Sequence, residues 1–240
     1  FANSSLESIF IPAFVSIIEK CTFLGCENLR TVKFSINSQL QSIGSEAFSH
    51  SAIEKISIPP LVYYIFESSF TFCKHLKTVE FQSNCELLSI EKFAFDHTSL
   101  KSVSIPPTVT KIDDHAFSNC VHLKTVDLTS DSNLSILGSE VFANSPVETI
   151  MIPSQVKKIS KGCFLNMPNL LSISISPENR YFSYLDNKFI IGKSDENRPI
   201  FDLLIYARLD IKEALIPFYI KLISAYAFSE CKYLKTVSFQ

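Results

Sequence analysis

The chain has 240 residues, of which 46% are hydrophobic and 19% are charged, and its formal net charge is −2. This apolar content can fill a large core and excludes a disordered chain, while the near-neutral charge argues against nucleic acid or an anionic membrane as a partner. Phe is abundant, with 21 residues, and Gly is scarce, with 5. Scarce Gly argues against phosphate-binding loops, and it predicts coils that turn with Pro, Ser and Asn rather than with positive-φ residues. Apolar runs are far shorter than the roughly 20 residues of a membrane span, so no membrane insertion is expected within this chain.

A repeat of 23 or 24 residues runs through the chain. Each copy opens with alternating apolar and polar residues, which predicts a short half-buried strand. In most 23-residue copies Pro follows and ends the strand, because it has no N–H to donate. The stretch around Ala116 and Phe117 predicts a short helical or 3₁₀ turn that places the Phe in the core. The copies start at Leu6, Leu29, Ile53, Leu76, Leu100, Leu123, Val147, Leu170 and Ile211, and their late phenylalanines are Phe23, Phe48, Phe70, Phe95, Phe117, Phe142, Phe164 and Phe228.

A single copy cannot bury its own apolar residues, so stacked copies must share one core. We therefore predict one solenoid array over residues 1–240, mostly β and irregular with short helical turns, in which each coil adds one strand to a parallel sheet. Residues 176–210 break the period. Two β-prone runs there, 181–191 and 200–206, flank a polar stretch at 193–199 and predict a hairpin inserted into one coil. Both chain ends fall inside a repeat, so we expect a fragment of a longer array, with any signal or anchor outside it.

The copies resemble the BspA-like, or treponemal-type, leucine-rich repeats through the pattern L-x-x-V-x-I-P-x-x-V-x-x-I-x-x-x-A-F-x-x-C-x-x-L. Residues 100–122 and 211–233 fit it best, while Met167 stands where Cys is expected, and Pro60 and Pro107 also depart from it. The inserted hairpin resembles the Asp-Asn/Gly hairpin of this family. The resemblance implies a leucine-rich repeat solenoid. It also implies a surface protein without an active site, associated with adhesion to host cells or matrix and with aggregation.

The cysteines favour packing over chemistry. Coils two apart lie about 10 Å from each other, too far for a disulfide, so buried free thiols are expected at the shared position. The same distance separates the pairs Cys73/His75 and Cys120/His122 and argues against zinc. The run from Asp113 to His115 is expected to be a solvated face, and no catalytic motif occurs. We therefore predict no enzyme activity, no metal and no cofactor. The cysteines at the shared position are Cys26, Cys73, Cys120 and Cys231.

The remaining candidates for function lie on the surface. The third residue of each copy, most often Ser or Thr, and the fifth, mostly polar, should point out of the sheet. Three aromatic residues occupy positions that are polar in other copies, which indicates either an exposed contact patch or packing against a neighbouring coil. Three lysines at the second position of consecutive copies form either a basic stripe that steers an acidic partner or a solvated edge. The aromatic residues are Tyr63, Tyr64 and Phe66, and the lysines are Lys77, Lys101 and Lys124.

These features predict a non-enzymatic recognition or adhesion module that binds a protein or glycoprotein ligand on host, matrix or neighbouring cells. Glycosylation sequons at Asn3 and Asn133 support secretion only weakly. The family resemblance favours the cell surface or an extracellular location. An intracellular leucine-rich repeat scaffold in the cytoplasm is the alternative, because free thiols suit a reducing compartment. A structural spacer is a third interpretation.

Overall fold

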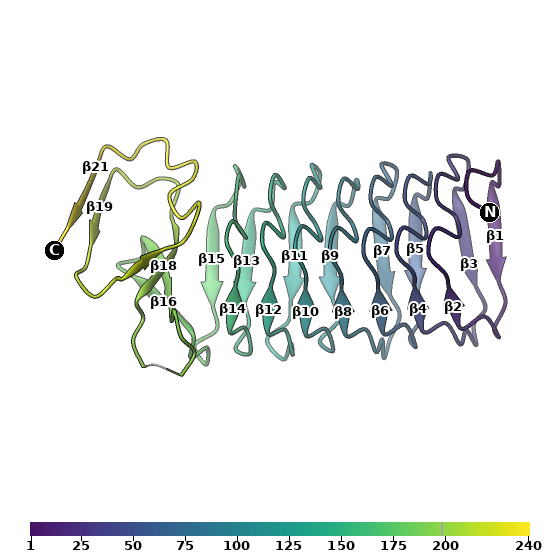
Figure 1. Cartoon of the computed structure of the whole chain (residues 1–240), viewed down its shortest axis with the longest axis horizontal. Coiled ribbons are helices and arrows are strands. Elements are labelled where there is room, and N and C mark those ends of the chain that lie inside the picture. Colours follow the sequence, from purple (N-terminus) through teal and green to yellow (C-terminus); the bar gives the residue numbers. More distant parts are fainter. Residues whose placement is uncertain (198) are drawn as a thin grey trace.

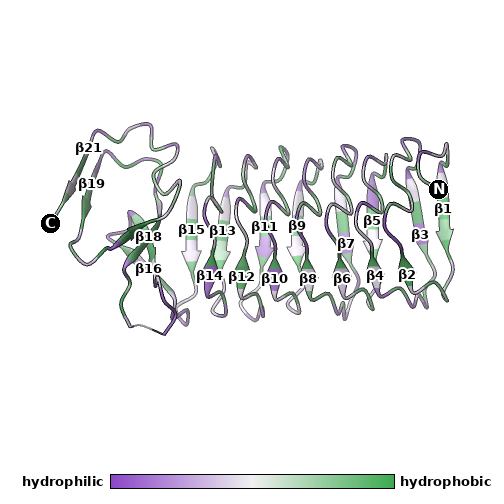
Figure 2. Cartoon of the chain, in the orientation of Figure 1, coloured by the Kyte–Doolittle hydropathy of each residue, from purple (hydrophilic) through white to green (hydrophobic). Residues whose placement is uncertain are grey.

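The structure is a computed structural model that describes residues 1–197 and 199–240. It is an elongated solenoid with the two chain termini at opposite ends (Figure 1). The predicted parallel sheet with one strand per coil is confirmed, because the opening strands of successive copies pair in register. Hydrophobic and hydrophilic residues recur along the coils with the same period (Figure 2).

Eight four-residue strands form what we call the long-strand sheet. Its ladder lapses between β7 and β9, where the Lys101 N–H donates to the Lys77 carbonyl at 3.4 Å and keeps the two coils adjacent. The strands are β1 (Ser8–Ile11), β3 (Thr31–Phe34), β5 (Lys55–Ile58), β7 (Thr78–Phe81), β9 (Ser102–Ile105), β11 (Thr125–Leu128), β13 (Thr149–Ile152) and β15 (Ser172–Ile175).

A second parallel sheet, which the sequence analysis missed, runs along the same coils. Each of its seven strands has only two residues, too few to give an alternating pattern. We call it the short-strand sheet. Its strands are β2 (Ile17–Ile18), β4 (Ser42–Ile43), β6 (Tyr64–Ile65), β8 (Ser89–Ile90), β10 (Lys111–Ile112), β12 (Ile136–Leu137) and β14 (Lys158–Ile159).

The core is organised by a ladder of phenylalanine rings, one from each coil. Neighbouring rings from Phe1 to Phe142 stack with centroids 5.1 to 6.1 Å apart and planes within 19° of parallel. From Phe23 onward these side chains are almost fully buried, as predicted. The ladder ends at Phe164, which meets Tyr206 of the insertion edge-on at 5.5 Å.

The turns around these phenylalanines differ from the prediction, because the described residues contain no helix. His115 and Asn119 have positive φ values of 57° and 55°, and the N–H groups of these residues donate to the next coil. Ala116 and Ser118 instead form i→i−3 bonds, so the direction of hydrogen bonding alternates and no helix can propagate. This pattern makes the turn a third inter-coil ladder.

The prediction, made from the low glycine content, that the coils turn without positive-φ residues was therefore wrong. Among the described residues, eighteen non-glycine residues have positive φ, compared with two glycines. A left-handed conformation costs an ordinary residue about 1–2 kcal/mol. Here the N–H of most such residues donates to a carbonyl of the next coil, as in Phe72 to Asp96 at 2.9 Å and Glu46 to Glu67 at 3.0 Å. The inter-coil ladder thus offsets a strain that glycine would avoid.

After β15 the chain leaves the regular array. The run 181–191 is itself a hairpin with a turn at Asp186 and Asn187, which have φ values of 52° and 54°. A third antiparallel strand follows the polar stretch, so the insertion is a three-stranded meander rather than the simple hairpin predicted. Arg198, in that polar stretch, lies outside the described residues. The strands here are β16 (Phe182–Leu185), β17 (Phe189–Gly192), β18 (Leu203–Ala207), β19 (Glu213–Ile216), β20 (Leu222–Ile223) and β21 (Thr236–Phe239).

Candidate interaction surface

The outer face of the long-strand sheet carries the third and fifth residues of each copy. Side chains at these positions are exposed or half-exposed from Ser8 to Ser174, as predicted. Polar pairs join neighbouring strands, with Lys55 Nζ 2.7 Å from Glu80 Oε1 and the Ser104 hydroxyl donating to Asp127 at 3.0 Å. The face is therefore a mostly polar surface on which such pairs hold side chains in register.

One exposed aromatic side chain on this face escaped the sequence analysis. Phe10 is the fifth residue of the first copy and is 59% exposed. Counting from Leu6 would have identified it, since the fifth residues of the following copies are mostly polar.

The predicted aromatic residues lie on the short-strand sheet, away from the polar face. Tyr64 and Phe66 are 40% and 39% exposed, and their rings stack with centroids 5.7 Å apart. Tyr63 hydrogen-bonds Glu86, and this carboxylate raises the pKa of the Tyr63 hydroxyl. In the register of the sheet, Tyr64 lies next to Ser42, which separates it from the exposed Ile17. The exposure of Tyr64 and Phe66 agrees with the predicted exposed patch, while a role of that patch in binding stays a prediction.

The predicted lysines occupy adjacent positions along the solenoid. The Lys101 N–H donates to the Lys77 carbonyl, and the Lys124 N–H donates to the Lys101 carbonyl at 3.0 Å. The row continues on both sides into a longer charged column, because the second residues of the two flanking copies are glutamates. Glu148 lies 3.4 Å from Lys124, and Glu54 is the neighbour of Lys77. In the described part of the chain, Lys77 and Lys101 form no ion pair, so they supply the free positive charge of the column.

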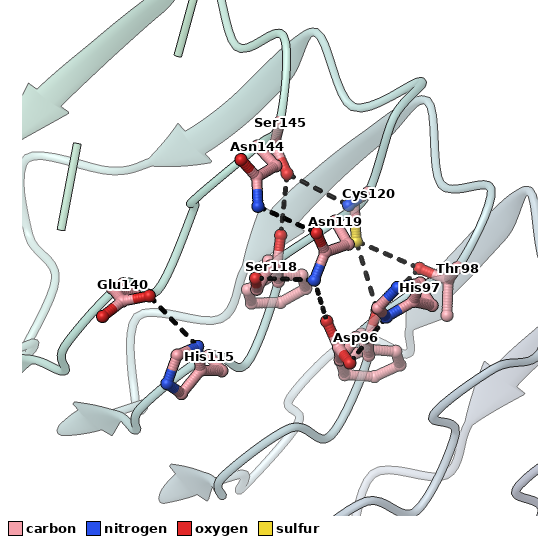
Figure 3. A network of polar contacts seen from close by, with 12 residues as sticks. Asp96, His97, Thr98, His115, Ser118, Asn119, Cys120, Glu140, Asn144 and Ser145 are labelled. Atoms are coloured by element: carbon pink, nitrogen blue, oxygen red, sulfur yellow. Dashed lines mark hydrogen bonds and ion pairs between the residues drawn. The ribbon is translucent and has the colours of Figure 1, made fainter. Parts of the chain in front are cut away.

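A polar ladder runs along the turns (Figure 3). Asn119 donates to Asp96 at 3.0 Å, Asn144 donates to Asn119 at 2.9 Å, and Asn166 donates to Asn144 at 2.6 Å. His97 closes one end through Nδ1, 2.8 Å from the other Asp96 oxygen. Because Asp96 and the three asparagines all join neighbouring coils, this ladder is structural.

The buried thiols are hydrogen-bonded as well as packed. Cys73 donates to the Phe48 carbonyl at 3.0 Å and Cys120 to the Phe95 carbonyl at 3.2 Å. Burial raises the pKa of Cys73 to about 11 and that of Cys120 to about 12. The position thus takes a small side chain that can also satisfy a buried carbonyl, a role that Met167 cannot fill.

The acidic run before His115 is not the solvated face expected from the sequence. Burial is the largest single influence on Asp113 and opposes its ionisation. The hydrogen bonds from Lys111 and from the Asp114 N–H, together with the charge of Lys111, outweigh burial and hold the pKa of Asp113 below its ordinary value. Asp114 accepts from the Ser139 N–H at 2.6 Å, and His115 stacks on Phe93 with centroids 4.7 Å apart. The three side chains turn to different partners and join coils instead of converging on a reaction centre.

Within residues 1–197 and 199–240, no group of three or more His, Cys, Asp or Glu side chains is arranged to hold a metal ion. Nor does that part of the chain contain a helix long and apolar enough to cross a membrane.

Known proteins resemble this chain in both sequence and fold. Residues 1–90, 88–187 and 204–240 match the family described as BspA type leucine-rich repeat region, in 6 copies. No curated protein matches the chain. A leucine-rich repeat protein from Bacteroides ovatus superposes with a TM-score of 0.69 at 24% identity, over 100% of this chain and 56% of the other. One from Eubacterium ventriosum gives 0.66 at 26% identity, over 78% of this chain and 47% of the other. The chain thus spans about half the length of these structures.

Proposed function

Because the chain belongs to the BspA-type leucine-rich repeat family, we propose that it is a non-enzymatic recognition module that binds a protein or glycoprotein ligand at the cell surface. The observation that carries the proposal is the outer face of the long-strand sheet. Its side chains are exposed or half-exposed, mostly polar, and held in register by paired backbones and by bridges such as Lys55–Glu80. A surface fixed before binding loses little conformational entropy on association.

The charged column gives this module its electrostatic preference. Lys77 and Lys101 project positive charge between carboxylates at either end of the row. Long-range attraction of this kind raises the association rate with an acidic partner and weakens with salt, because these side chains are exposed.

The aromatic patch, defined as Tyr63, Tyr64 and Phe66, offers a second contact of a different kind. Half-exposed stacked rings give apolar area at small entropic cost, and Tyr is enriched among the residues that dominate binding energy. The patch lies on another sheet from the lysines, so a ligand that uses both must wrap around the edge of the solenoid.

A binding experiment separates these contributions. The probe is immobilised extracellular-matrix protein, and the variants are Lys77→Gln/Lys101→Gln/Lys124→Gln and Tyr63→Ser/Tyr64→Ser. A matched control, Lys158→Gln/Lys161→Gln/Lys188→Gln, removes the same charge from exposed lysines elsewhere. The proposal predicts slower association for the first triple variant only, and weaker binding with unchanged melting temperature for the aromatic variant. If the two triple lysine variants slowed association equally, a specific role of the charged column would be refuted.

The location at the surface needs a separate test. Biotinylation of intact cells that express the full-length protein should label it without lysis. Labelling only after lysis would favour the cytoplasmic scaffold, which the buried free thiols permit.

A further inference from the structure

The long-strand sheet has an open edge where the insertion begins. β15 pairs with β13 on one side, and no strand pairs with its other side in the described part of the chain. The next strand, β16, pairs antiparallel with β17 in a separate sheet. The N–H and C=O groups on the free side of β15 therefore lack backbone partners, and such an edge is a template for another strand.

A cleft of about 550 Å³ lies along this edge. One side is formed by residues 170–173, and the other by Tyr184, Asn187, Tyr206 and Arg208 from the insertion. The volume falls within the roughly 300–1,000 Å³ of typical ligand sites. The edge of β15 is thus accessible through the cleft, whose opposite wall is formed by the insertion.

The far wall is preorganised and close to neutral. Arg208 binds both carboxylate oxygens of Asp210, at 3.0 and 2.7 Å, and reaches the Asn187 carbonyl at 3.4 Å. Burial raises the pKa of both Tyr184 and Tyr206, so their hydroxyl groups stay protonated at physiological pH. The wall therefore offers aromatic rings and uncharged hydrogen-bonding groups in place of a site for an ion.

The side of the cleft formed by residues 170–173 carries an apolar residue at a position that is charged in all of the other copies. Leu171 is the second residue of its copy and is 76% exposed. The corresponding residues of the other copies are Glu7, Arg30, Glu54, Lys77, Lys101, Lys124, Glu148, Lys212 and Lys235. The one break in this charged column thus coincides with the open edge.

We propose that this cleft binds an extended, weakly charged peptide segment of a partner protein by strand addition to β15. The peptide backbone pairs with the free N–H and C=O groups of β15, while the exposed side chains of Leu171 and Tyr184 contact the side chains of the peptide. Tyr206, which is 7% exposed, lines the cleft behind them. Main-chain pairing supplies affinity and the flanking side chains supply specificity. The site includes none of the three lysines and none of the aromatic patch, so its test is independent of the test of the function proposed above.

The test uses a displayed library of random seven-residue peptides, panned against the wild-type chain. Peptides that bind β15 should bind Leu171→Lys, which restores the charge found in other copies, at least about tenfold more weakly. Val121→Lys, a change at an exposed residue on the turns, is the matched control. On binding, the amides of β15 should gain protection from hydrogen exchange. Only every second N–H of the peptide should point toward β15. N-methylation of those residues should therefore abolish binding, whereas N-methylation of the intervening residues should leave binding unchanged.

Three outcomes would overturn the proposal. The first is a library that yields no peptide sensitive to Leu171→Lys. The second is selected peptides that tolerate N-methylation of both sets of residues. The third is a concentration-dependent dimer in analytical ultracentrifugation that Leu171→Lys dissolves, because the occupant would then be a second copy of this chain.

Discussion

Truncation of one ring of the phenylalanine ladder tests the account of stability most directly. Phe95 is fully buried and stacks between Phe70 at 5.2 Å and Phe117 at 5.3 Å. Phe→Ala in a core costs about 3–5 kcal/mol, and we expect the upper part of that range because coils on both sides lose a partner. Phe95→Leu keeps most of the apolar volume but loses both ring contacts, worth about 0.5–1.5 kcal/mol each. It should therefore cost about 1–3 kcal/mol in total.

The assay is urea unfolding followed by circular dichroism, with Phe66→Ala as a half-exposed control that should cost less than about 1 kcal/mol. If Phe95→Leu matched the wild type within about 0.5 kcal/mol, stacking would add nothing beyond burial. If Phe95→Ala cost no more than the control, the ladder would not be the core of the fold.

The remaining predictions concern coil spacing, thiols and the polar ladder. Gly138→Ala places a Cβ in steric overlap with the backbone of Asp113 and Asp114, so the coils must part and the unfolding free energy in urea should fall by about 1–3 kcal/mol. Raised thiol pKa values keep Cys73 and Cys120 neutral in the folded state, while unfolded thiols ionise near pH 9.0. Stability from these thiols is therefore complete below that pH and is lost as pH rises toward about 11–12. Hence Cys73→Ala/Cys120→Ala should show a smaller loss of stability than the wild type between about pH 8 and 10.5, and an equal loss would contradict burial of the thiols. Asn144→Ala removes two ladder bonds and should cost about 1–2 kcal/mol by the same assay, whereas no change would make the ladder incidental.

Features that repeat in every copy could be predicted. Phe48, Phe95 and Phe142 recur at one position of the repeat, and a residue that recurs in every coil must face the shared interior. The same logic placed the lysines in one row, because equal positions in successive copies become neighbours. It also located the thiols in the core, although it missed the bonds that Cys73 and Cys120 donate to carbonyls.

Features that depend on backbone geometry could not be predicted. The two-residue strands are too short for a period-2 signal, so the sheet that holds Tyr64 was missed. The left-handed residues resemble ordinary turn residues in sequence, and only the inter-coil bonds of His115 and Asn119 explain why glycine is absent there.

The sequence by itself determined the solenoid, its period and its core, because a stacked repeat turns each position of the pattern into a continuous row. The tertiary structure decided where the long-strand sheet ends and which partners the side chains of each row contact. It paired Lys124 with Glu148, and it left β15 without a neighbour beside a tyrosine-lined cleft. The physical reason is that a repeat specifies contacts between equivalent positions, whereas the open edge at β15 arises because the meander folds away from the sheet.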